Sequence, residues 1–245
     1  KDESETLLML YEELCQIARH NFRLLGLPIQ VVNGNSAEML PSMPLQDWIF
    51  LDPARRDGIG NKVVALSDCE PDVCQMEALL LQKAAHVMVK CSPMLDISQA
   101  LAQLTSVREV HVVSVSNECK ELLLVLGGRA GGGVSVCTVN FHGNHVHTFD
   151  FTYEEEQEAQ CIYTAAVGRY LYEPNSSMMK AGCFRLPALR YGLEKLHRNT
   201  HLYTSDILVP DFPGRVFEVK SVDGFGKNEL KRLSSELKKA NLAVR

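Results

Sequence analysis

The sequence predicts an α/β fold with a mostly parallel sheet, followed by a small C-terminal α+β module. Short apolar runs typical of buried strands alternate with segments that have the apolar spacing of amphipathic helices. The chain has 245 residues, enough for one large domain or two smaller ones. Its charge is uneven: residues 1–179 contain 12 Lys and Arg against 23 Asp and Glu, whereas residues 180–245 contain 13 against 7. The basic C-terminal part therefore predicts a second module that faces something anionic.

The composition is that of a soluble globular protein, with 46% apolar and 22% charged residues. No apolar run approaches the ~20 residues that a membrane span needs, and the acidic, polar N-terminus does not have the pattern of a signal peptide. The eight cysteines contain no CxxC pair, which argues against a zinc ribbon. We expect reduced thiols in a cytoplasmic protein.

The first half of the chain alternates helices and strands. Residues 14–25 have helical apolar spacing, and Gly26 and Pro28 form a stop signal behind them. Further helices are predicted at residues 73–85 and 97–104. Buried strands are predicted at residues 29–32, 48–51, 86–90, 110–115 and 122–126.

Two later segments are predicted as turns. The sequence GGRAGGG at residues 127–133 lacks the GK[ST] ending of a phosphate-binding loop, so we expect a hairpin tip between strands at 122–126 and 134–141. The sequence HGNHVH at residues 142–147 contains Gly143-Asn144, which is typical of a turn; a metal site is the alternative reading.

The character of the sequence changes after residue 151. An acidic helix is predicted from residue 153 to residue 172, with its glutamates at the positive helix N-terminus, and another helix at residues 184–196. Strands are predicted at residues 200–206 and 215–222, and a basic amphipathic helix at residues 227–245. We place domain boundaries accordingly at 1–151, 152–183 and 184–245.

The stretch DWIFLDPARRDG, residues 47–58, ends a buried strand with Asp52 and Pro53. In an open parallel sheet, ligands bind beyond the carboxyl ends of the strands, where Asp52 would lie. Proline fixes the turn and donates no hydrogen bond, so a carboxylate and a carbonyl would face the crevice. Arg55 and Arg56 follow, and arginine suits phosphate recognition. The alternative is a helix-capping aspartate beside solvated arginines.

The order of four segments resembles the second half of a class I S-adenosylmethionine-dependent methyltransferase. They are LCQIARHNFRLLGL, IQVVNGNSAEML, DWIFLDPARRD and HVMVKCSPMLD. The DPAR sequence resembles the motif that follows the fourth strand of these enzymes. The resemblance implies S-adenosylmethionine as cofactor, with Asn35 and Ser36 near its adenine ring and Asp52 beside it.

The chain as a whole resembles a bacterial family of such methyltransferases with a C-terminal THUMP-like domain. The resemblance rests on LDPARRD, KCSPMLDI, NECKELL, YLYEPN, KAG, THLYTS and FPGRVFEV. It implies a Rossmann-like catalytic part at 1–151, a small ferredoxin-like or helical connector at 152–183, and a truncated THUMP-like module at 184–245. It also implies an RNA substrate, tRNA being one candidate, with Arg215 and Lys231 in the basic module as binding residues and no membrane partner.

The chain departs from this family at its N-terminal side. No glycine-rich cofactor loop precedes residue 14, and Met9 stands roughly where the family has an acidic residue for the ribose. Glu12 and Glu13 have the positions of helix-start residues instead. We therefore expect an interior fragment, or the ordered part of a longer protein, whose cofactor pocket is incomplete.

Two chemistries fit the motif residues. For an exocyclic amine, the Asp52 carboxylate and the Pro53 carbonyl would accept hydrogens and aim the lone pair. For uracil C5, Cys91 would be the nucleophile, with Lys90 lowering its pKa and Glu118 as base. Lys90, like Arg55 and Arg56, is also a candidate to bind substrate.

The alternative interpretation is that Cys91 is an ordinary buried cysteine at a strand end and has no catalytic role. Two other functions stay open: an RNA-binding protein without activity, and a small-molecule methyltransferase whose C-terminal module only dimerises.

Overall fold

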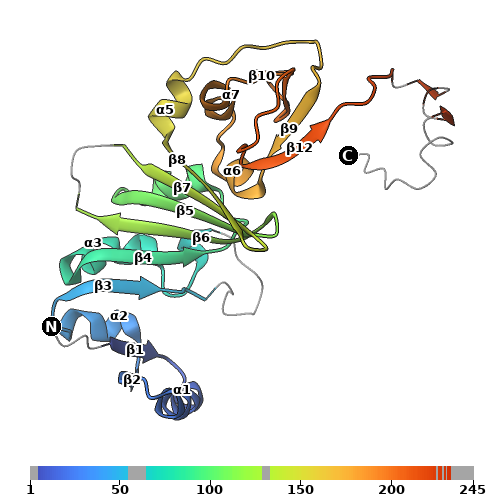
Figure 1. Cartoon of the computed structure of the whole chain (residues 1–245). Coiled ribbons are helices and arrows are strands. Elements are labelled where there is room, and N and C mark those ends of the chain that lie inside the picture. The colour runs from blue at the N-terminus through green and yellow to red at the C-terminus, as the bar shows by residue number, and fades with distance from the viewer. Residues whose placement is uncertain are drawn as a thin grey trace. The chain divides into compact units, whose positions relative to one another are not determined.

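The computed structural model describes residues 5–54, 65–128 and 133–224, together with residues 226, 227, 229, 231 and 232 (Figure 1). The chain forms two compact units. Unit 1 comprises Lys1–Glu158 and Ser176–Cys183, and unit 2 comprises Ala159–Asn175 and Phe184–Arg245. This division differs from the expected one, because the segment placed at 152–183 as a connector contributes to both units.

Unit 1 contains two sheets. One is two-stranded, with the parallel pair β1-β2, and the other is six-stranded, in the order β3-β4-β6-β5-β7-β8. Each predicted strand of the first half is present, and β1 is an additional strand that we did not predict. The strands are β1 (Glu5–Met9), β2 (Ile29–Asn33), β3 (Gln46–Leu51), β4 (Ala84–Cys91), β5 (Val107–Val115), β6 (Glu118–Gly127), β7 (Ser135–His142) and β8 (His145–Thr152).

Local signals mark the ends of several helices of unit 1. Helix α1 ends at Gly26, whose left-handed φ of 68° favours glycine. The Asp72 and Asp96 side chains cap α3 and α4 by accepting backbone N–H groups. The helices are α1 (Glu12–Leu25), α2 (Ser36–Met39), α3 (Val73–Lys83), α4 (Ile97–Gln103), α5 (Tyr153–Glu158) and α6 (Ser176–Ala181), with 3-10 turns η1 (Leu40–Ser42) and η2 (Leu66–Asp68).

The six-stranded sheet is mixed, so the expectation of a mostly parallel sheet was wrong. Its parallel pairs are β3-β4 and β5-β7, and the other three pairings are antiparallel. The cause of one antiparallel pairing is local: only Ser116 and Asn117 separate β5 from β6, and both have positive φ angles, of 51° and 63°. Two such residues make the tight turn that matches the twist of a hairpin.

The glycine-rich segment does not close the predicted hairpin. Strand β6 pairs with β4 and β5, whereas β7 pairs with β5 and β8. The strands on either side of residues 127–133 are therefore not neighbours in the sheet, and residues 129–132 lie outside the described residues. The second predicted turn is confirmed, because β7 and β8 form a hairpin in which His142 lies opposite His145.

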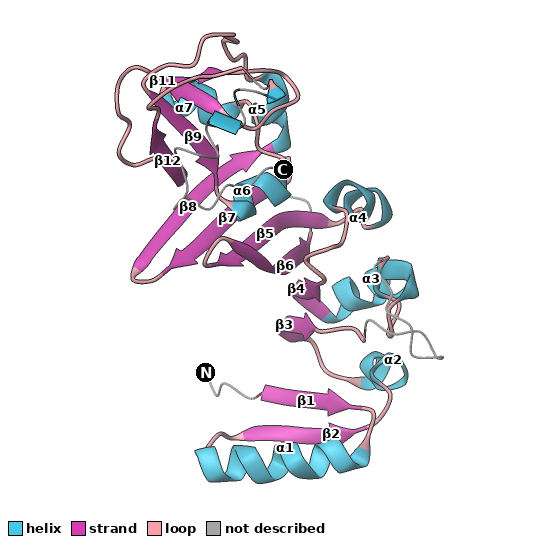
Figure 2. Ribbon diagram, turned by 90° about the vertical axis from the view of Figure 1, so that its right-hand side faces the viewer, coloured by secondary structure: helices cyan, strands magenta, loops and turns pink. Residues whose placement is uncertain are grey.

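One face of the six-stranded sheet forms the core of unit 1. Val87 and Val89 of β4 and Leu122 and Leu124 of β6 are fully buried there. Helix α3 packs on β4, and α6 packs on β5, β6 and β7 (Figure 2). The opposite face carries exposed apolar side chains, namely Trp48, Phe50, Val115, Phe141 and Val146.

Unit 2 is built on a four-stranded antiparallel sheet in the order β10-β11-β9-β12. Its core joins Tyr172, Tyr203 and Phe212, and the ring of Phe212 lies edge-on to that of Tyr172 at 5.2 Å between centroids. Its elements are β9 (Tyr170–Pro174), α7 (Leu186–Tyr191), β10 (Glu194–Lys195), β11 (Tyr203–Ser205) and β12 (Gly214–Glu218).

The predicted helices of this region were too long. Helix α5 ends at Glu158, and Tyr170–Pro174, expected as the end of that helix, is the strand β9. Helix α7 stops at Gly192, which has a left-handed φ of 63°, so β10 begins inside the second predicted helix. Pairing with β11 and β12 overrides the local helical pattern of β9. The basic helix expected at residues 227–245 falls mostly outside the described residues.

All eight cysteines lie among the described residues, and no two of them form a disulfide. None of the described helices has both the length and the apolar character that crossing a bilayer requires.

The buried face of β6 provides a test of this core. Leu124→Ala removes a fully buried side chain at the centre of the sheet, so we expect the free energy of unfolding to fall by about 2–5 kcal/mol. The measurement is urea unfolding followed by fluorescence of Trp48, the single tryptophan, which lies in unit 1. Leu45→Ala, at a side chain that is 79% exposed, is the control and should leave the midpoint nearly unchanged. Equal midpoints for the two variants would contradict the described core.

Candidate functional site

The carboxyl ends of β2 and β3 bring two predicted residues to one cavity. Ser36 follows β2 and Asp52 follows β3, and both line a cavity of about 250 Å³. Pro53 also lines it, so the Asp-Pro pair borders this cavity. Apolar side chains make up most of the remaining wall, namely Leu7, Leu8, Leu40, Met43, Trp48, Ile49, Phe50, Leu51, Pro71, Met76 and Leu80.

The cavity lies between two open sheet edges. Among the described residues, β1 pairs only with β2 and β3 pairs only with β4, so each lies at the edge of its sheet. Both edges contribute to the cavity, with Thr6, Leu7 and Leu8 from β1 and residues 48–51 from β3. The cavity wall therefore includes backbone N–H and C=O groups that have no partner strand.

Asn35 does not line this cavity. It is the N-cap of α2, where its Oδ1 accepts the backbone N–H of Ala37 at 2.9 Å. Its Nδ2 donates to Glu38 Oε1 at 3.4 Å. The side chain thus stabilises the start of α2 and holds the loop that presents Ser36.

Asp52 forms an ion pair with Lys90. Lys90 Nζ lies 3.0 Å from Asp52 Oδ2 and 3.9 Å from Glu121 Oε1. The three residues come from neighbouring strands, since β4 lies between β3 and β6. Lys90, expected to bind substrate, is therefore flanked by two carboxylates, and Glu121 is a site residue that the sequence prediction missed.

Cys91 lies on the other face of the sheet from Lys90. Side chains alternate along a strand, and Cys91 is 4% exposed, like its buried neighbours Val87 and Val89. Its thiol lies 3.6 Å from the Val89 carbonyl. The ammonium of Lys90 is directed at Asp52 instead, so the expected activation of this thiol by Lys90 has no support in the geometry.

Glu118 lies on the surface, where it pairs with Lys120 at 2.8 Å and its side chain is 72% exposed. The structure therefore brings Asp52 and Lys90 together but shows no contact between Glu118 and Cys91 in the described part of the chain.

Four other residues were predicted to bind substrate. Arg55 and Arg56 fall outside the described residues. Arg215, on β12, pairs with Glu173 of β9 and lies over the ring of Phe217 at 5.7 Å. Lys231 is exposed.

Two features were missed by sequence reasoning. Strand β1 is short, and its apolar residues Leu7, Leu8 and Met9 were the available signal. Glu121 stands among the apolar residues of β6, directly before the run LLLVL. A charged residue directly before a run of five apolar residues was the signal that could have marked it.

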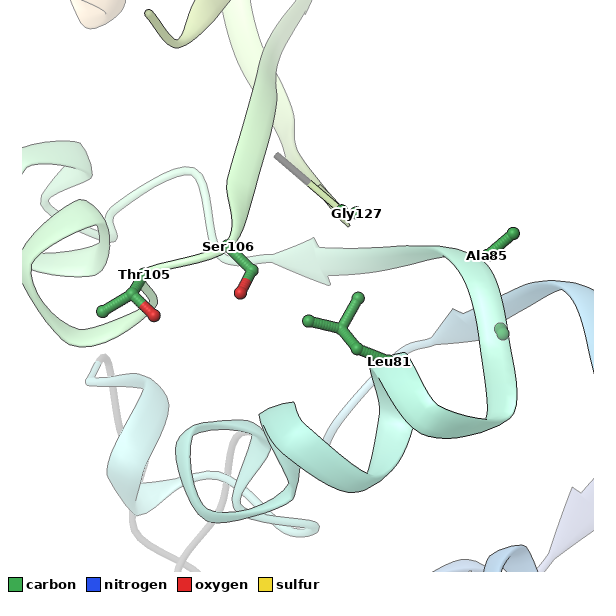
Figure 3. A pocket seen from close by; sticks show the side chains of 7 residues that line it. Leu81, Ala85, Thr105, Ser106 and Gly127 are labelled. Atoms are coloured by element: carbon green, nitrogen blue, oxygen red, sulfur yellow. The ribbon is translucent and has the colours of Figure 1, made fainter. Parts of the chain in front are cut away.

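A further cavity lies away from Asp52. It measures about 740 Å³ and is lined by residues from the start of β4, the end of β6 and the segment before β5 (Figure 3). Ala84 and Ala85 mark the amino end of β4, opposite to the end that carries Lys90. None of its lining residues, Leu81, Ala84, Ala85, Thr105, Ser106, Gly127 and Gly128, has an ionisable side chain. We place the candidate site at Asp52, because its cavity lies at the carboxyl ends of β2 and β3, where open α/β sheets bind ligands.

The burial of Cys91 predicts the order in which thiols react. In the native protein, iodoacetamide should modify Cys161, which is partly exposed, before Cys119. Burial raises the pKa of the Cys119 thiol, which keeps it protonated and slow. Cys91 should react last, and mass spectrometry of tryptic peptides measures all three rates. Modification of Cys91 as fast as that of Cys161 would contradict the described burial.

Three comparisons relate the chain to known proteins. Residues 170–213, most of which belong to unit 2, match a family model described as a ferredoxin-like domain. Two relatives from Mycobacterium tuberculosis, strains CDC 1551 / Oshkosh and ATCC 25618 / H37Rv, are each named "uncharacterized S-adenosylmethionine-dependent methyltransferase". Each is 26% identical over 222 residues, which is 90% of this chain and 57% of the relative.

A solved structure agrees with these relatives. The crystal structure of a "putative methyltransferase" from Porphyromonas gingivalis W83 superimposes with a TM-score of 0.87 and 35% sequence identity. The match covers 97% of this chain and 60% of that one. The chain thus spans about three fifths of the length of proteins named as methyltransferases, and it is similar to them over almost all of its own length.

Proposed function

We propose that the protein is an S-adenosylmethionine-dependent methyltransferase that acts on RNA. The single observation that carries the enzyme part is the cavity that joins Ser36 and Asp52 at the carboxyl ends of β2 and β3. Ligands of open α/β sheets bind at this edge. The names of the relatives and of the structural neighbour support the same reaction and cofactor.

The residues around the cavity fit the proposed cofactor. A hydroxyl on Ser36 and a carboxylate on Asp52 provide hydrogen-bonding groups, and the apolar wall suits a planar ring. When bound, S-adenosylmethionine supplies a methyl group attached to a positively charged sulfur. Ser36 and Asp52 would hold the cofactor, and the Leu40 and Met43 side chains would exclude water from that side.

The open edges of β1 and β3 support a further proposal about the fold. We propose that one additional strand pairs with both edges and joins the two sheets of unit 1 into one Rossmann-like sheet. Each edge offers unpaired backbone groups, and both line the same cavity. The loop after this strand would complete the cofactor pocket next to Asp52.

Asp52 and Pro53 would position the nucleophile. The Asp52 carboxylate and the Pro53 carbonyl accept hydrogens from an amine, which directs its lone pair along the line of displacement. The alternative chemistry, with Cys91 as nucleophile and Glu118 as base, has less support because the Cys91 thiol lies on the buried face of β4. Cys91→Ala should therefore leave methyl transfer unchanged.

The proposal of an RNA substrate rests on the C-terminal part of the chain. Residues 180–245 carry an excess of positive charge, 13 Lys and Arg against 7 Asp and Glu. The ferredoxin-like match at 170–213 is compatible with an appended module of THUMP-like type. We propose that this module recruits the RNA, with Arg215 and Lys231 near its phosphates.

The cofactor proposal predicts binding of S-adenosylhomocysteine. Calorimetric titration of the full-length gene product should show binding, and Asp52→Asn should weaken it about tenfold, because a hydrogen bond to a charged group is lost. Asp47→Asn, the same change at an exposed residue of β3 outside the cavity, is the matched control. If residues 1–245 bind as tightly as the full-length product, the additional strand is not required. No binding by either protein would favour an RNA-binding protein without activity.

The RNA proposal predicts a charge-dependent affinity. The double variant Arg215→Glu and Lys231→Glu should weaken binding of mixed tRNA and flatten the dependence of log affinity on log salt concentration. Arg23→Glu, on the exposed surface of α1 in unit 1, should change neither quantity. Fluorescence anisotropy at several salt concentrations measures both. An unchanged slope with unchanged methyl transfer would point to a small-molecule substrate instead.

A further inference from the structure

We infer that Lys90 is a positioning residue for Asp52, and that Glu121 holds Lys90 in place from the neighbouring strand. This inference rests on the proposed function of Asp52 as a cofactor-binding residue. It assigns a role to Glu121. For Lys90, it replaces the expected direct binding of substrate with the positioning of Asp52.

The register of the sheet brings the three side chains together. Leu51 lies opposite Val89 in the parallel pair β3-β4, so the next residues on each strand, Asp52 and Lys90, are neighbours. On the other side of β4, Lys90 lies opposite Leu123 of β6, and Glu121 is two residues away on the same face. Three adjacent strands thus present a carboxylate, an ammonium and a carboxylate in a row.

The distances and exposures define the role of each group. The Lys90 side chain is 27% exposed, less than those of Asp52 at 48% and Glu121 at 38%. The cation therefore lies deepest in the row, at 3.0 Å from Asp52 and 3.9 Å from Glu121. Glu121 Oε1 is the oxygen that faces Lys90, whereas Oε2 is buried and accepts no hydrogen bond from a described residue.

This arrangement argues against a phosphate on Lys90. A phosphate that approached Lys90 would meet two carboxylates that already surround the ammonium, and like charges repel. The same ammonium fixes one oxygen of Asp52 and leaves the other to a ligand in the cavity. Without Lys90, the half-exposed Asp52 side chain would sample several rotamers, and a ligand would have to order it on binding.

The test is a double-mutant cycle in the full-length gene product, with S-adenosylhomocysteine as the probe. Lys90→Met should weaken binding about fivefold, Lys90→Arg should restore most of the affinity, and Asp52→Asn with Lys90→Met should bind no more weakly than Asp52→Asn alone. Glu121→Gln should weaken binding less than Lys90→Met. Lys220→Met, at an exposed lysine that pairs with Glu218 in unit 2, is the matched control and should bind like the wild type.

Several results would overturn the inference. Wild-type affinity in Lys90→Met, or additive losses in the double variant, would show that Lys90 does not act through Asp52. A loss of mixed-tRNA affinity and of its salt slope in Lys90→Met would assign the lysine to a phosphate instead.

If the wild type itself does not bind the probe, the proposed function fails. Thermal unfolding of the wild type, the single variants Asp52→Asn and Lys90→Met, and the double variant then tests whether Lys90 orders Asp52. Non-additive shifts in melting temperature would retain Lys90 as the residue that orders Asp52, and additive shifts would reject it.

Discussion

The parallel register between β3 and β4 is the constraint on which the candidate site depends. It places Asp52 beside Lys90, at the edge where β3 leaves the sheet. Because side chains alternate along a strand, the same register directs Cys91 to the buried face. A slip of one residue would exchange the two faces and bring the thiol, rather than the ammonium, to the cavity. The apolar packing of Val87 and Val89 prevents such a slip, and so fixes which chemistry the site presents.

The hairpin from β5 to β6 adds the third member of the charged row. Its turn at Ser116 and Asn117 returns the chain as an antiparallel strand between β5 and β4, which brings Glu121 to Lys90. The turn is held from outside the hairpin as well. The Asn117 backbone N–H donates to Asn140 Oδ1, and its side chain accepts the N–H of Ser176 at the start of α6. The turn is thus tied to β7 and to the start of α6.

In unit 2, the number of positively charged residues does not by itself describe how the charges on the surface are paired. Two of its arginines are paired with acids, Arg215 with Glu173 and Arg169 with Glu218. Exposed ion pairs of this kind exchange partners at little cost, so they leave the arginines available to a polyanion. Inside the unit, the buried Lys195 ammonium donates hydrogen bonds to the carbonyls of His197, Arg198 and Thr200. It thereby satisfies three backbone acceptors in the loop between β10 and β11.

The sequence by itself determined most strands and helices of the first half, because apolar periodicity is a local signal. It also placed Asp52 and Pro53 directly after the end of a buried strand, where the structure has them at the end of β3. The tertiary structure alone decided the mixed order of the sheet, the strand character of Tyr170–Pro174, the burial of Cys91 and the partners of Lys90. Each of these depends on pairing between segments far apart in the chain. The Lys90–Glu121 contact spans strands whose register no local pattern encodes, since it follows from how the buried faces of β4 and β6 pack.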